Sequence, residues 1–504
     1  MYEDRIRDPR LMGKIMPAQE AAALFRSGMT VGMSGFTKAG DCKAMPAALA
    51  DRARADGLTL NLVTGASLGN DSDGLMAASG LLARRLPFQG DATLRGRIND
   101  GSVMFIDQHL SDTAEQLRTG NLPRINVAVI EAVAITEDGG IVPTTSVGNS
   151  ATFAQQAEQI VIELNLRMPL TLEGLHDIYT PGDRPEREPT PLVRVDDRIG
   201  DAVIRVDPER IIAIVLTDHE DAPSANLPPD GETEAIARHV VAFLEGEVKA
   251  GRLSPSLLPL QAGIGTIANA VLHGLVESSF ENLTMYSEVL QDSAFELIDS
   301  GQCVFASASS ITVSEKMSRS FLEGLDRYRS KLVLRPQEIS NLPEIVRRLG
   351  IIAINTALEV DIYGNVNSTH VNGTHMMNGI GGSGDFARNA HLAIFVTKSV
   401  AKQGAISSVV PMVPHVDHTE HDVDIVVTEW GLADLRGLAP RERAVRIIEQ
   451  CAHPDYRDAL RTYYREACQR GGQTPHCLEQ AFAWHRRFQQ TGTMLEPVVA
   501  SEMA

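Results

Sequence analysis

The feature of this sequence that most restricts its fold is an internal duplication. Three pairs of matching segments recur at nearly the same separation along the chain. They are GIVPTTSV (140–147) with GNVNSTHV (364–371), Gly35 with Gly263, each after a predicted strand, and LNLVTG (60–65) with LTMYSE (283–288). Such a constant separation indicates two copies of one fold in a single chain.

Predicted strands and helices alternate in both copies, which favours two related α/β domains. The 504 residues are too many for one hydrophobic core and fit two large domains. A polar, proline-rich stretch at 217–235 follows the apolar segment IIAIVL and predicts a linker, so we expect the domains to span 1–220 and 221–504. From Pro440 onward the pattern is helical, which predicts a helical C-terminal tail covering the second domain.

The charge of the chain restricts its partners. A net charge of −19, spread along the sequence, argues against a nucleic-acid or anionic-membrane surface. No run of about 18 apolar residues is present to span a bilayer, and the N-terminal segment has no apolar core of a signal peptide. Five cysteines without a CxxC pair fit a reducing compartment. We therefore expect a cytoplasmic protein, with a processed organellar form as the alternative.

A carboxylate at the end of one predicted strand indicates a catalytic site. In TMYSEVLQDS (284–293), Glu288 comes where an apolar strand ends and a helical pattern begins. Ligands of open α/β folds lie at the carboxyl ends of strands, and the first copy has only Gly65, Ala66 and Ser67 at the matching place. The alternative is a glutamate that caps the following helix or pairs with a basic side chain. Its presence in one copy alone favours catalysis.

Two glycine-rich segments are candidates for binding an anion or an oxyanion. In QAGIGTIANAVLHGL (261–275), a predicted strand runs into a GIG turn and then a helix, whose first N–H groups could bind an anion. The third glycine of the dinucleotide fingerprint is missing, which argues against NAD. In MMNGIGGSGDFARNA (376–390), a ligand could approach the main chain closely, and N–H groups could face a developing oxyanion. A loop that is merely tight is the alternative.

Other side chains have weaker claims to function. Lys398 and Lys402 follow the predicted strand LAIFVT, where a cation could contact a phosphate, although a solvated lysine is the usual case. Glu429, in VVTEWG, is a second strand-end carboxylate, either functional or structurally paired. Cys42 could be a nucleophile, but a passive thiol is favoured because no base is near it in sequence.

Three histidines, His415, His418 and His421 of HVDHTEHD, raise the question of a metal site. Their spacing matches neither the HExxH helix nor a tetrahedral zinc finger. We therefore expect hydrogen-bonded loop histidines and no metal, which elemental analysis of the active protein would test.

Several motifs together resemble a known family. They are YSEVLQDS, GIGTIAN, GNVNSTHVNGTHMMNGIGGSGDFARNA, HVDH and TEWGLADLRGLAP, and the likeness extends from SGFT near the N-terminus to TGTML near the end. The chain resembles the acetyl-CoA hydrolase/transferase family, most closely its succinyl-CoA:acetate CoA-transferase branch. The resemblance implies two CoA-transferase α/β domains of the type also seen in sugar-phosphate isomerases, with the active site between them. It also implies a homodimer, and coenzyme A as a substrate rather than a permanently bound cofactor.

The resemblance implies roles for individual residues. The Glu of YSEV, here Glu288, is the nucleophile, and an Asn in a segment like ISNLPEI, here Asn341, accompanies it. Gly382 of the glycine-rich loop and Glu429 of TEWG are further active-site groups. The residues implied in CoA binding are Gly263, Ile264, Gly265, Thr266, Ile267, Asn378, Gly382 and Lys402. The backbone N–H groups of Gly382 and Ile264 are the candidate oxyanion donors.

The implied reaction moves CoA between an acyl-CoA, such as succinyl-CoA, and a short carboxylate such as acetate, through a γ-glutamyl-CoA thioester on Glu288. Hydrolysis of a short acyl-CoA by the same glutamate, and a CoA-sensing protein without turnover, are the alternatives. Asp41-Cys42 stands where the family usually has an uncharged pair, and 217–223 is acidic where succinyl-using relatives tend to be basic. A second substrate carboxylate would be poorly received there, so acetate is a more secure expectation than succinate.

Overall fold

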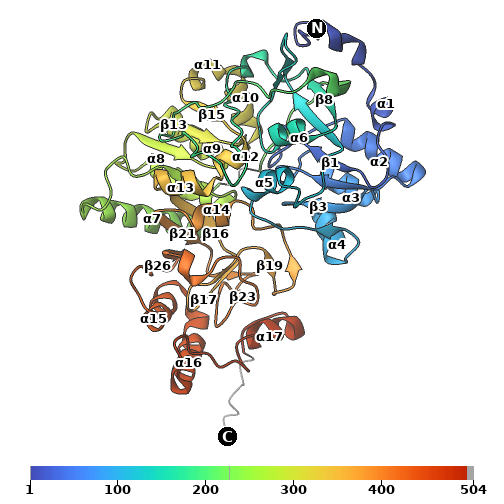
Figure 1. Cartoon of the computed structure of the whole chain (residues 1–504). Helices are drawn as coiled ribbons and strands as arrows, with labels where there is room; N and C mark the ends of the chain where they lie inside the picture. The colour runs from blue at the N-terminus through green and yellow to red at the C-terminus, as the bar shows by residue number, and fades with distance from the viewer. Residues whose placement is uncertain (1, 226–227, 497–504) are drawn as a thin grey trace.

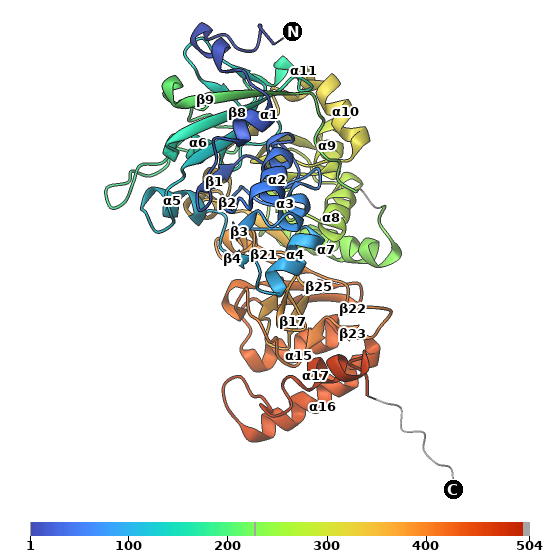
Figure 2. The same cartoon turned by 90° about the vertical axis from the view of Figure 1, so that its right-hand side faces the viewer.

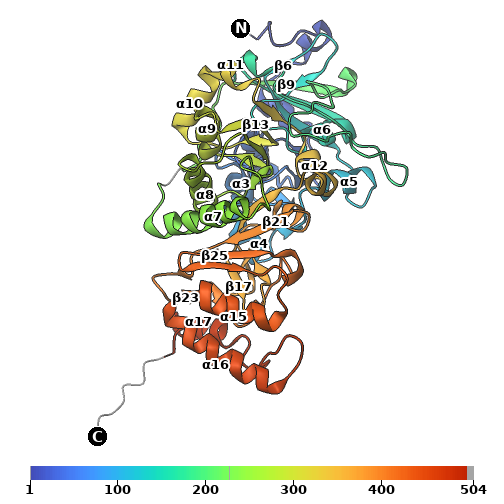
Figure 3. The ribbon, with the colours of Figure 1, turned by 90° about the vertical axis from the view of Figure 1, so that its left-hand side faces the viewer.

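Two parallel sheets with helices on their faces, followed by a helical C-terminal part, make up the chain (Figure 1). The computed structural model describes residues 2–225 and 228–496. In the side views of Figures 2 and 3, the C-terminal helices lie at the end of the molecule opposite the N-terminus. The predicted fold class, two related α/β domains with a helical tail, is confirmed.

The first sheet has the strand order β4-β3-β2-β1-β5-β8-β9 and is parallel throughout. Its strands are β1 (Thr30–Met33), β2 (Leu60–Val63), β3 (Leu82–Leu86), β4 (Met104–Phe105), β5 (Val127–Ala132), β8 (Gln159–Asn165) and β9 (Ile211–Thr217). Its helices are α1 (Ala18–Ala22), α2 (Met45–Asp56), α3 (Ser72–Ala78), α4 (Ala92–Asn99), α5 (Asp112–Arg118) and α6 (Ser150–Gln156). Gly32 lets α6 approach β1, because a Cβ there would lie 2.6 Å from the Phe153 ring.

The second sheet has the order β15-β13-β11-β10-β16-β21-β25-β26, and only β26 is antiparallel to its neighbour. Its strands are β10 (Leu260–Ala262), β11 (Leu283–Tyr286), β13 (Cys303–Ala308), β15 (Leu332–Leu334), β16 (Ile352–Thr356), β21 (Leu392–Val396), β25 (Ile425–Thr428) and β26 (Gly431–Asp434). The accompanying helices are α7 (Gly231–Lys249), α8 (Thr266–Val276), α9 (Asp292–Asp299), α10 (Glu315–Glu323), α11 (Leu325–Tyr328), α12 (Gln337–Ser340), α13 (Pro343–Leu349) and α14 (Ser383–Ala387).

The two sheets repeat one topology, which confirms the duplication. Each begins with a central strand (β1, β10), continues outward on one side, and then resumes on the other side of the first strand (β5, β16). The matching segments at 60–65 and 283–288 form β2 and β11, and those at 140–147 and 364–371 contain β7 (Ile141–Val142) and β18 (Val366–Asn367). The boundary near residue 220 stays a prediction, between the end of β9 and the start of α7.

The apolar run ISSVV (406–410) predicts a single strand, and this prediction is wrong. The run forms two short strands outside the main sheet, β23 (Ile406–Ser407) and β24 (Val409–Val410). The chain changes partner at Ser408: β23 pairs with β22 (Val400–Ala401) and β24 with β17 (Glu359–Asp361). The reason is that an apolar run alone does not say which neighbour it will pair with.

The C-terminal helices cover a separate part of the core, as expected. They are α15 (Pro440–Cys451), α16 (Pro454–Arg470) and α17 (Ala483–Thr491). Ile447, Leu460 and Trp484 from these helices join one cluster of buried side chains with Val360 and Val426 of β17 and β25. The tail therefore buries apolar surface against the second half of the chain.

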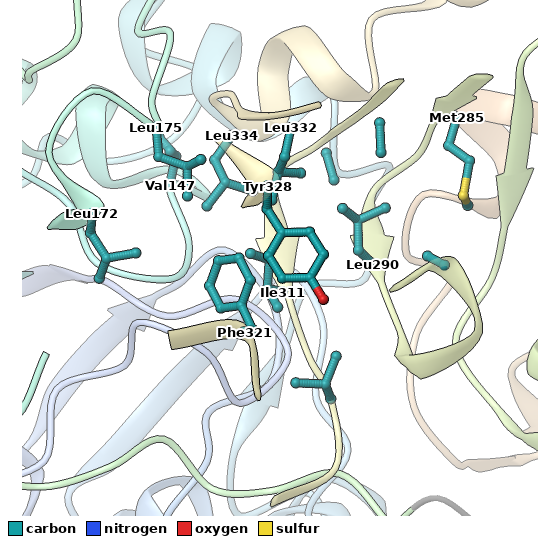
Figure 4. Packing of buried hydrophobic residues seen from close by; sticks show 14 of the residues in the cluster. Val147, Leu172, Leu175, Met285, Leu290, Ile311, Phe321, Tyr328, Leu332 and Leu334 are labelled. Atoms are coloured by element: carbon teal, nitrogen blue, oxygen red, sulfur yellow. The ribbon is translucent and has the colours of Figure 1, made fainter. Parts of the chain in front are cut away.

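The largest hydrophobic cluster crosses from the first copy of the fold to the second. Figure 4 shows Val147, Leu172 and Leu175 of the first copy close to Leu334 and Phe321 of the second. This shared core fixes the two copies against each other, because apolar area buried between them stabilises their contact. Within the part of the chain that the structure describes, no helix is long and apolar enough to cross a membrane.

Candidate active site

A cavity of about 110 Å³ lies at the ends of β10, β11 and β16, where the strand order of the second sheet reverses. Open α/β sheets bind ligands at such a switch point. The ends of β10 (261–264), β11 (288–289) and β16 (355–356) line it, together with the glycine-rich loop (378–383). Phe88 of the first domain closes one side. The cavity thus joins segments that the sequence analysis named separately.

The main chain around Glu288 is fixed on both sides. Glu288 accepts a hydrogen bond at its carbonyl from the Ser309 N–H at 3.0 Å, and the Ser287 N–H donates to the Ser307 carbonyl at 2.9 Å. Directly after it, Val289 and Leu290 form β12, which pairs with β14 (Ser310–Ile311). With the backbone held in this way, the Glu288 side chain is the part that reaches the cavity.

The carboxylate of Glu288 contacts the side chain of Asn341 and the main chain of Gly382. The Asn341 Nδ2 donates to Glu288 Oε2 at 2.8 Å. A Cβ at Gly382 would overlap both Glu288 Oε2 and Asn341 Nδ2, so any larger residue would have to displace these two side chains. Burial raises the pKa of Glu288 to about 7, and the Asn341 hydrogen bond opposes part of this rise. The structure therefore brings together three of the predicted residues: Glu288, Asn341 and Gly382.

Sequence reasoning missed a second carboxyl group at this site. Asp385 of α14 is buried, and its Oδ2 accepts from Asn341 Nδ2 at 3.3 Å. Ser111 of the first domain donates to Asp385 with its N–H at 3.1 Å and its hydroxyl at 2.6 Å. Burial raises the pKa of Asp385 to about 8. GSGDF shows the aspartate beside the glycines, but no sequence pattern links it to Ser111, 274 residues away.

The first domain also holds the glycine-rich loop, which was not expected. The Ile380 N–H donates to both carboxylate oxygens of Asp107, at 2.9 and 3.2 Å. Asn99 exchanges two hydrogen bonds of 2.9 Å with the main chain of Met376, and Arg95 donates to the Met377 carbonyl at 2.7 Å. The loop that meets Glu288 is thus positioned across the domain interface.

The predicted CoA-binding residues lie in three places. Gly263, Ile264 and Asn378 line the cavity, and Ile264 is 38% exposed. Gly265, with φ of 128°, precedes Thr266 and Ile267, the first residues of α8. Gln291 ties the GIG turn to the segment after Glu288, because it accepts from the Gly265 N–H at 3.2 Å and donates to the Gly263 carbonyl at 3.0 Å. Lys402 lies elsewhere, exposed on the β22–β23 hairpin with its Nζ 4.9 Å from the Phe488 ring centre.

Glu429 lies away from Glu288 in the sheet. It follows β25, and β10, β16 and β21 separate β25 from β11, a distance of about 19 Å at the usual strand spacing. The Ser399 N–H donates to Glu429 Oε2 at 2.8 Å, and the Ser399 hydroxyl donates to Oε1. Lys398 forms ion pairs with Asp230 at 2.5 Å and Glu232 at 2.8 Å. The structure does not join Glu429 or Lys398 to the Glu288 cavity.

The cysteine and histidine candidates have structural partners. Cys42 is fully buried near Ser34 Oγ at 3.4 Å, and burial raises its thiol pKa well above the usual value. His418 contacts Ser383 Oγ at 3.1 Å, and burial lowers its pKa to about 4. Within 2–225 and 228–496, no three His, Cys, Asp or Glu side chains lie close enough together to hold a metal ion.

The acidic segment 217–223 forms two ion pairs, one between Glu220 and Arg167 and one between Asp221 and Lys43. Asp221 accepts from Lys43 Nζ at 2.7 Å, and the same ammonium group lies 2.7 Å from Glu131 and 3.8 Å from Asp41. Asp41 itself is fully buried. Glu220 and Asp221 line a second, larger cavity of about 660 Å³ between segments of both domains.

Comparison with known proteins gives a consistent assignment over the whole chain. The N-terminal domain of the acetyl-CoA hydrolase/transferase family matches residues 3–216, and the C-terminal domain matches residues 318–464. The chain is 51% identical over 495 residues to succinyl-CoA:acetate CoA-transferase of Clostridium kluyveri, which covers 98% of this chain and 92% of that protein. It is 45% identical over 517 residues to acetyl-CoA hydrolase of Eremothecium gossypii, covering 99% of this chain and 98% of the relative.

Among solved structures, the chain is similar to the crystal structure of RipA from Yersinia pestis. The TM-score is 0.70 with 22% identity, and the match covers 92% of this chain and 98% of that one. At this identity the likeness supports the fold alone.

Proposed function

The chain belongs to the acetyl-CoA hydrolase/transferase family and is an enzyme of the CoA-transferase type, and we propose that it moves CoA from a short acyl-CoA to acetate or a similar carboxylate through a γ-glutamyl-CoA thioester on Glu288. The observation that carries this proposal is the Glu288 carboxylate, hydrogen-bonded to Asn341 and pressed against Gly382 in a strand-end cavity. The name of the Clostridium kluyveri relative supports the same reaction.

The first half of the reaction loads CoA onto the enzyme. A Glu288 oxygen attacks the acyl carbonyl carbon, the acyl carbon–sulfur bond breaks, and CoA leaves as a thiolate while a mixed anhydride forms. The thiolate then attacks the glutamyl carbonyl, the anhydride bond breaks, and the acyl carboxylate departs. Glu288 now carries CoA as a thioester.

The second half returns CoA to a new carboxylate. The acceptor carboxylate attacks the glutamyl carbonyl and expels the thiolate, which gives a new mixed anhydride. The thiolate attacks the acceptor carbonyl, forms the new acyl-CoA and frees the Glu288 carboxylate. The energy of the thioester is retained as long as water is kept from the anhydride.

The groups around Glu288 are suited to these steps. A pKa of about 7 makes Glu288 a stronger nucleophile than an ordinary carboxylate and leaves a useful fraction ionised near neutral pH. Asn341 Nδ2 already donates to the oxygen that becomes the glutamyl carbonyl or its oxyanion. The N–H groups of Gly382 and Ile264, both at the cavity, are the proposed donors to the oxyanion of the acyl group.

We further propose that the CoA chain extends from the GIG turn toward Lys402. Lys402→Ala should raise KM for the acyl-CoA about tenfold with kcat nearly unchanged, because a lost phosphate contact removes uniform binding. Lys398→Ala is the control, since Lys398 is engaged with Asp230 and Glu232. Equal KM values in the two variants would remove Lys402 from the binding site.

The preferred acceptor in this proposal is acetate. Asp221 and Asp41 share Lys43, and Arg167 pairs with Glu220, so the cations that contact the acidic segment already have carboxylate partners. A dicarboxylate would need a free cation to receive its second charge. Comparison of acetate with succinate as acceptors tests this, and higher kcat/KM with succinate would contradict it.

The covalent intermediate provides the decisive test. Incubation with acyl-CoA and no acceptor should leave a CoA adduct on the peptide that contains residues 284–293, visible by mass spectrometry. Glu288→Ala should abolish both the adduct and the transfer. An adduct that mapped to Glu429 or Cys42 would make the assignment of Glu288 wrong.

Two other functions are distinguished by the same experiment. An acyl-CoA hydrolase would form the adduct but release free thiol at the same rate with or without acetate. A CoA-sensing protein would bind acyl-CoA with neither adduct nor turnover. The hydrolase alternative is supported by the name of the Eremothecium gossypii relative.

A further inference from the structure

We propose that Asp385 is a positioning residue, which holds the Asn341 carboxamide with its NH₂ group toward Glu288 throughout the reaction. This inference rests on the proposed function, because it assigns a task in the thioester chemistry of Glu288. Glu288 lines the cavity, whereas Asp385 does not and acts through Asn341.

The geometry of the carboxamide shows what sets its orientation. Asn341 Nδ2 carries two hydrogens, and it donates to Glu288 Oε2 at 2.8 Å and to Asp385 Oδ2 at 3.3 Å. The other end of the carboxamide, Oδ1, is buried and has no hydrogen-bond partner within the described residues. A flipped amide would point Oδ1 at two carboxyl groups. The two acceptors at Nδ2, rather than a donor to Oδ1, therefore fix the orientation.

Of these two acceptors, only Asp385 remains a carboxyl group throughout the reaction. When Glu288 becomes an anhydride and then a thioester, it loses its negative charge and turns into a weak carbonyl acceptor. Asp385 is not consumed in any step. Its hold on Asn341 keeps the second N–H of the carboxamide directed at the glutamyl oxygen when that oxygen must accept charge again.

Asp385 is itself held firmly by the other domain. Ser111 donates to it with both its N–H and its hydroxyl, at 3.1 and 2.6 Å. Ser111 is the residue before α5, which packs against α12, and Asn341 is the residue directly after α12. The orientation of the carboxamide therefore depends on the first domain, although the nucleophile belongs to the second.

The test is Asp385→Asn, which preserves shape and keeps one of the two oxygens that accept hydrogen bonds from Ser111. The new amide can donate to Asn341 Oδ1 and so favours the flipped carboxamide. We expect kcat and the rate of adduct formation to fall about 100-fold, as for the loss of one oxyanion donor, with KM for acyl-CoA nearly unchanged. Asp361→Asn is the matched control, because Asp361 is an equally buried carboxylate that accepts backbone N–H bonds away from Glu288.

A double-mutant cycle with Asn341→Ala separates positioning from a general structural effect. If Asp385 acts through Asn341, then Asp385→Asn should cost less than twofold once Asn341 is absent. Ser111→Ala, which removes one donor to Asp385, should cost several-fold in the wild-type background and nothing in Asn341→Ala. This variant serves if Asp385→Asn does not fold.

Equal losses from Asp385→Asn with and without Asn341 would overturn the inference, as would an Asp385→Asn enzyme with full kcat. These outcomes are distinct from a failure of the proposed function, in which the wild-type protein itself would form no adduct on Glu288 and transfer no CoA.

Discussion

At the scale of single residues, the closest packing in the site is at Gly382. Its φ of −90° is open to any residue, so the glycine is required for space rather than for backbone freedom. A Cβ there would overlap Glu288 Oε2 and Asn341 Nδ2. The residue therefore links loop geometry directly to the position of Glu288, the proposed nucleophile.

Gly382→Ala should lower kcat by at least about 100-fold while the protein stays folded. The added methyl group would displace the Glu288 carboxylate by about 1 Å, and such misplacement costs on the order of 100-fold. Steady-state kinetics and a melting curve measure the two effects. Gly246→Ala is the control, because a Cβ at this position in α7 meets nothing within 4 Å. Normal kcat in Gly382→Ala would exclude the loop from the mechanism.

The raised pKa of Glu288 predicts a pH-dependent cost in stability. The folded protein holds this proton up to about pH 7, against an ordinary pKa of 4.5, so the stabilising contribution is full below pH 4.5 and is lost as pH rises through 7. Glu288→Gln removes that loss. At pH 8 its free energy of unfolding should exceed that of the wild type by on the order of 1–2 kcal/mol, which raises the melting temperature. At pH 5 the two proteins should melt at similar temperatures. A constant difference at both pH values would contradict the assignment.

At the scale of elements, sequence patterns located the strand ends but not the contacts between them. Apolar runs that stop at polar residues predicted β11 and the position of Glu288 at its end. The closely spaced glycines at 379–384 predicted the glycine-rich loop. The partners of that loop were not predicted, since Asp107 and Ile380 are 273 residues apart and neither segment has a periodicity that reports the other. In the same way, Glu429 shares a strand-end pattern with Glu288 although three strands lie between β11 and β25.

The contact between the glycine-rich loop and the first domain gives a prediction at this scale. Asp107→Ala removes the acceptor for the Ile380 N–H and leaves that donor without its partner, which costs about 1–3 kcal/mol. We expect faster hydrogen exchange in 376–384 and a kcat about tenfold lower. Asp100→Ala, in an exposed turn of the same domain, should change neither. Unchanged exchange in Asp107→Ala would show that other contacts hold the loop.

At the scale of the whole molecule, the two copies share a fold but differ in the residues that they contribute to the candidate active site. Both copies repeat one sheet topology, yet Glu288, Asn341 and Asp385 all belong to the second. The first copy supplies Ser111, Asp107 and Phe88, which position or enclose that chemistry. The first copy thus positions the residues of the candidate active site, and the interface between the copies is part of that site.

A buried ion pair at that interface leads to a prediction about water. Arg118 of α5 donates to both Glu338 oxygens, one at 2.8 Å, and both side chains are nearly inaccessible, at 6% and 4% exposure. Glu338 lies in α12, the helix that directly precedes Asn341. This pair is therefore buried at the interface next to Asn341, which donates a hydrogen bond to the proposed nucleophile Glu288.

Arg118→Met should both destabilise the protein and admit water to the anhydride. Leaving Glu338 buried without its partner costs about 3–5 kcal/mol, and Arg118→Met/Glu338→Gln should recover part of that cost. In both variants we expect acyl-CoA hydrolysis to rise several-fold relative to CoA transfer, because the interface that excludes water is looser. Free thiol release is compared with acyl-CoA formation from acetate, and Arg461→Met, which breaks an exposed pair with Glu449, is the control. A lower melting temperature with an unchanged ratio of hydrolysis to transfer would mean that the pair stabilises the interface while water is excluded elsewhere.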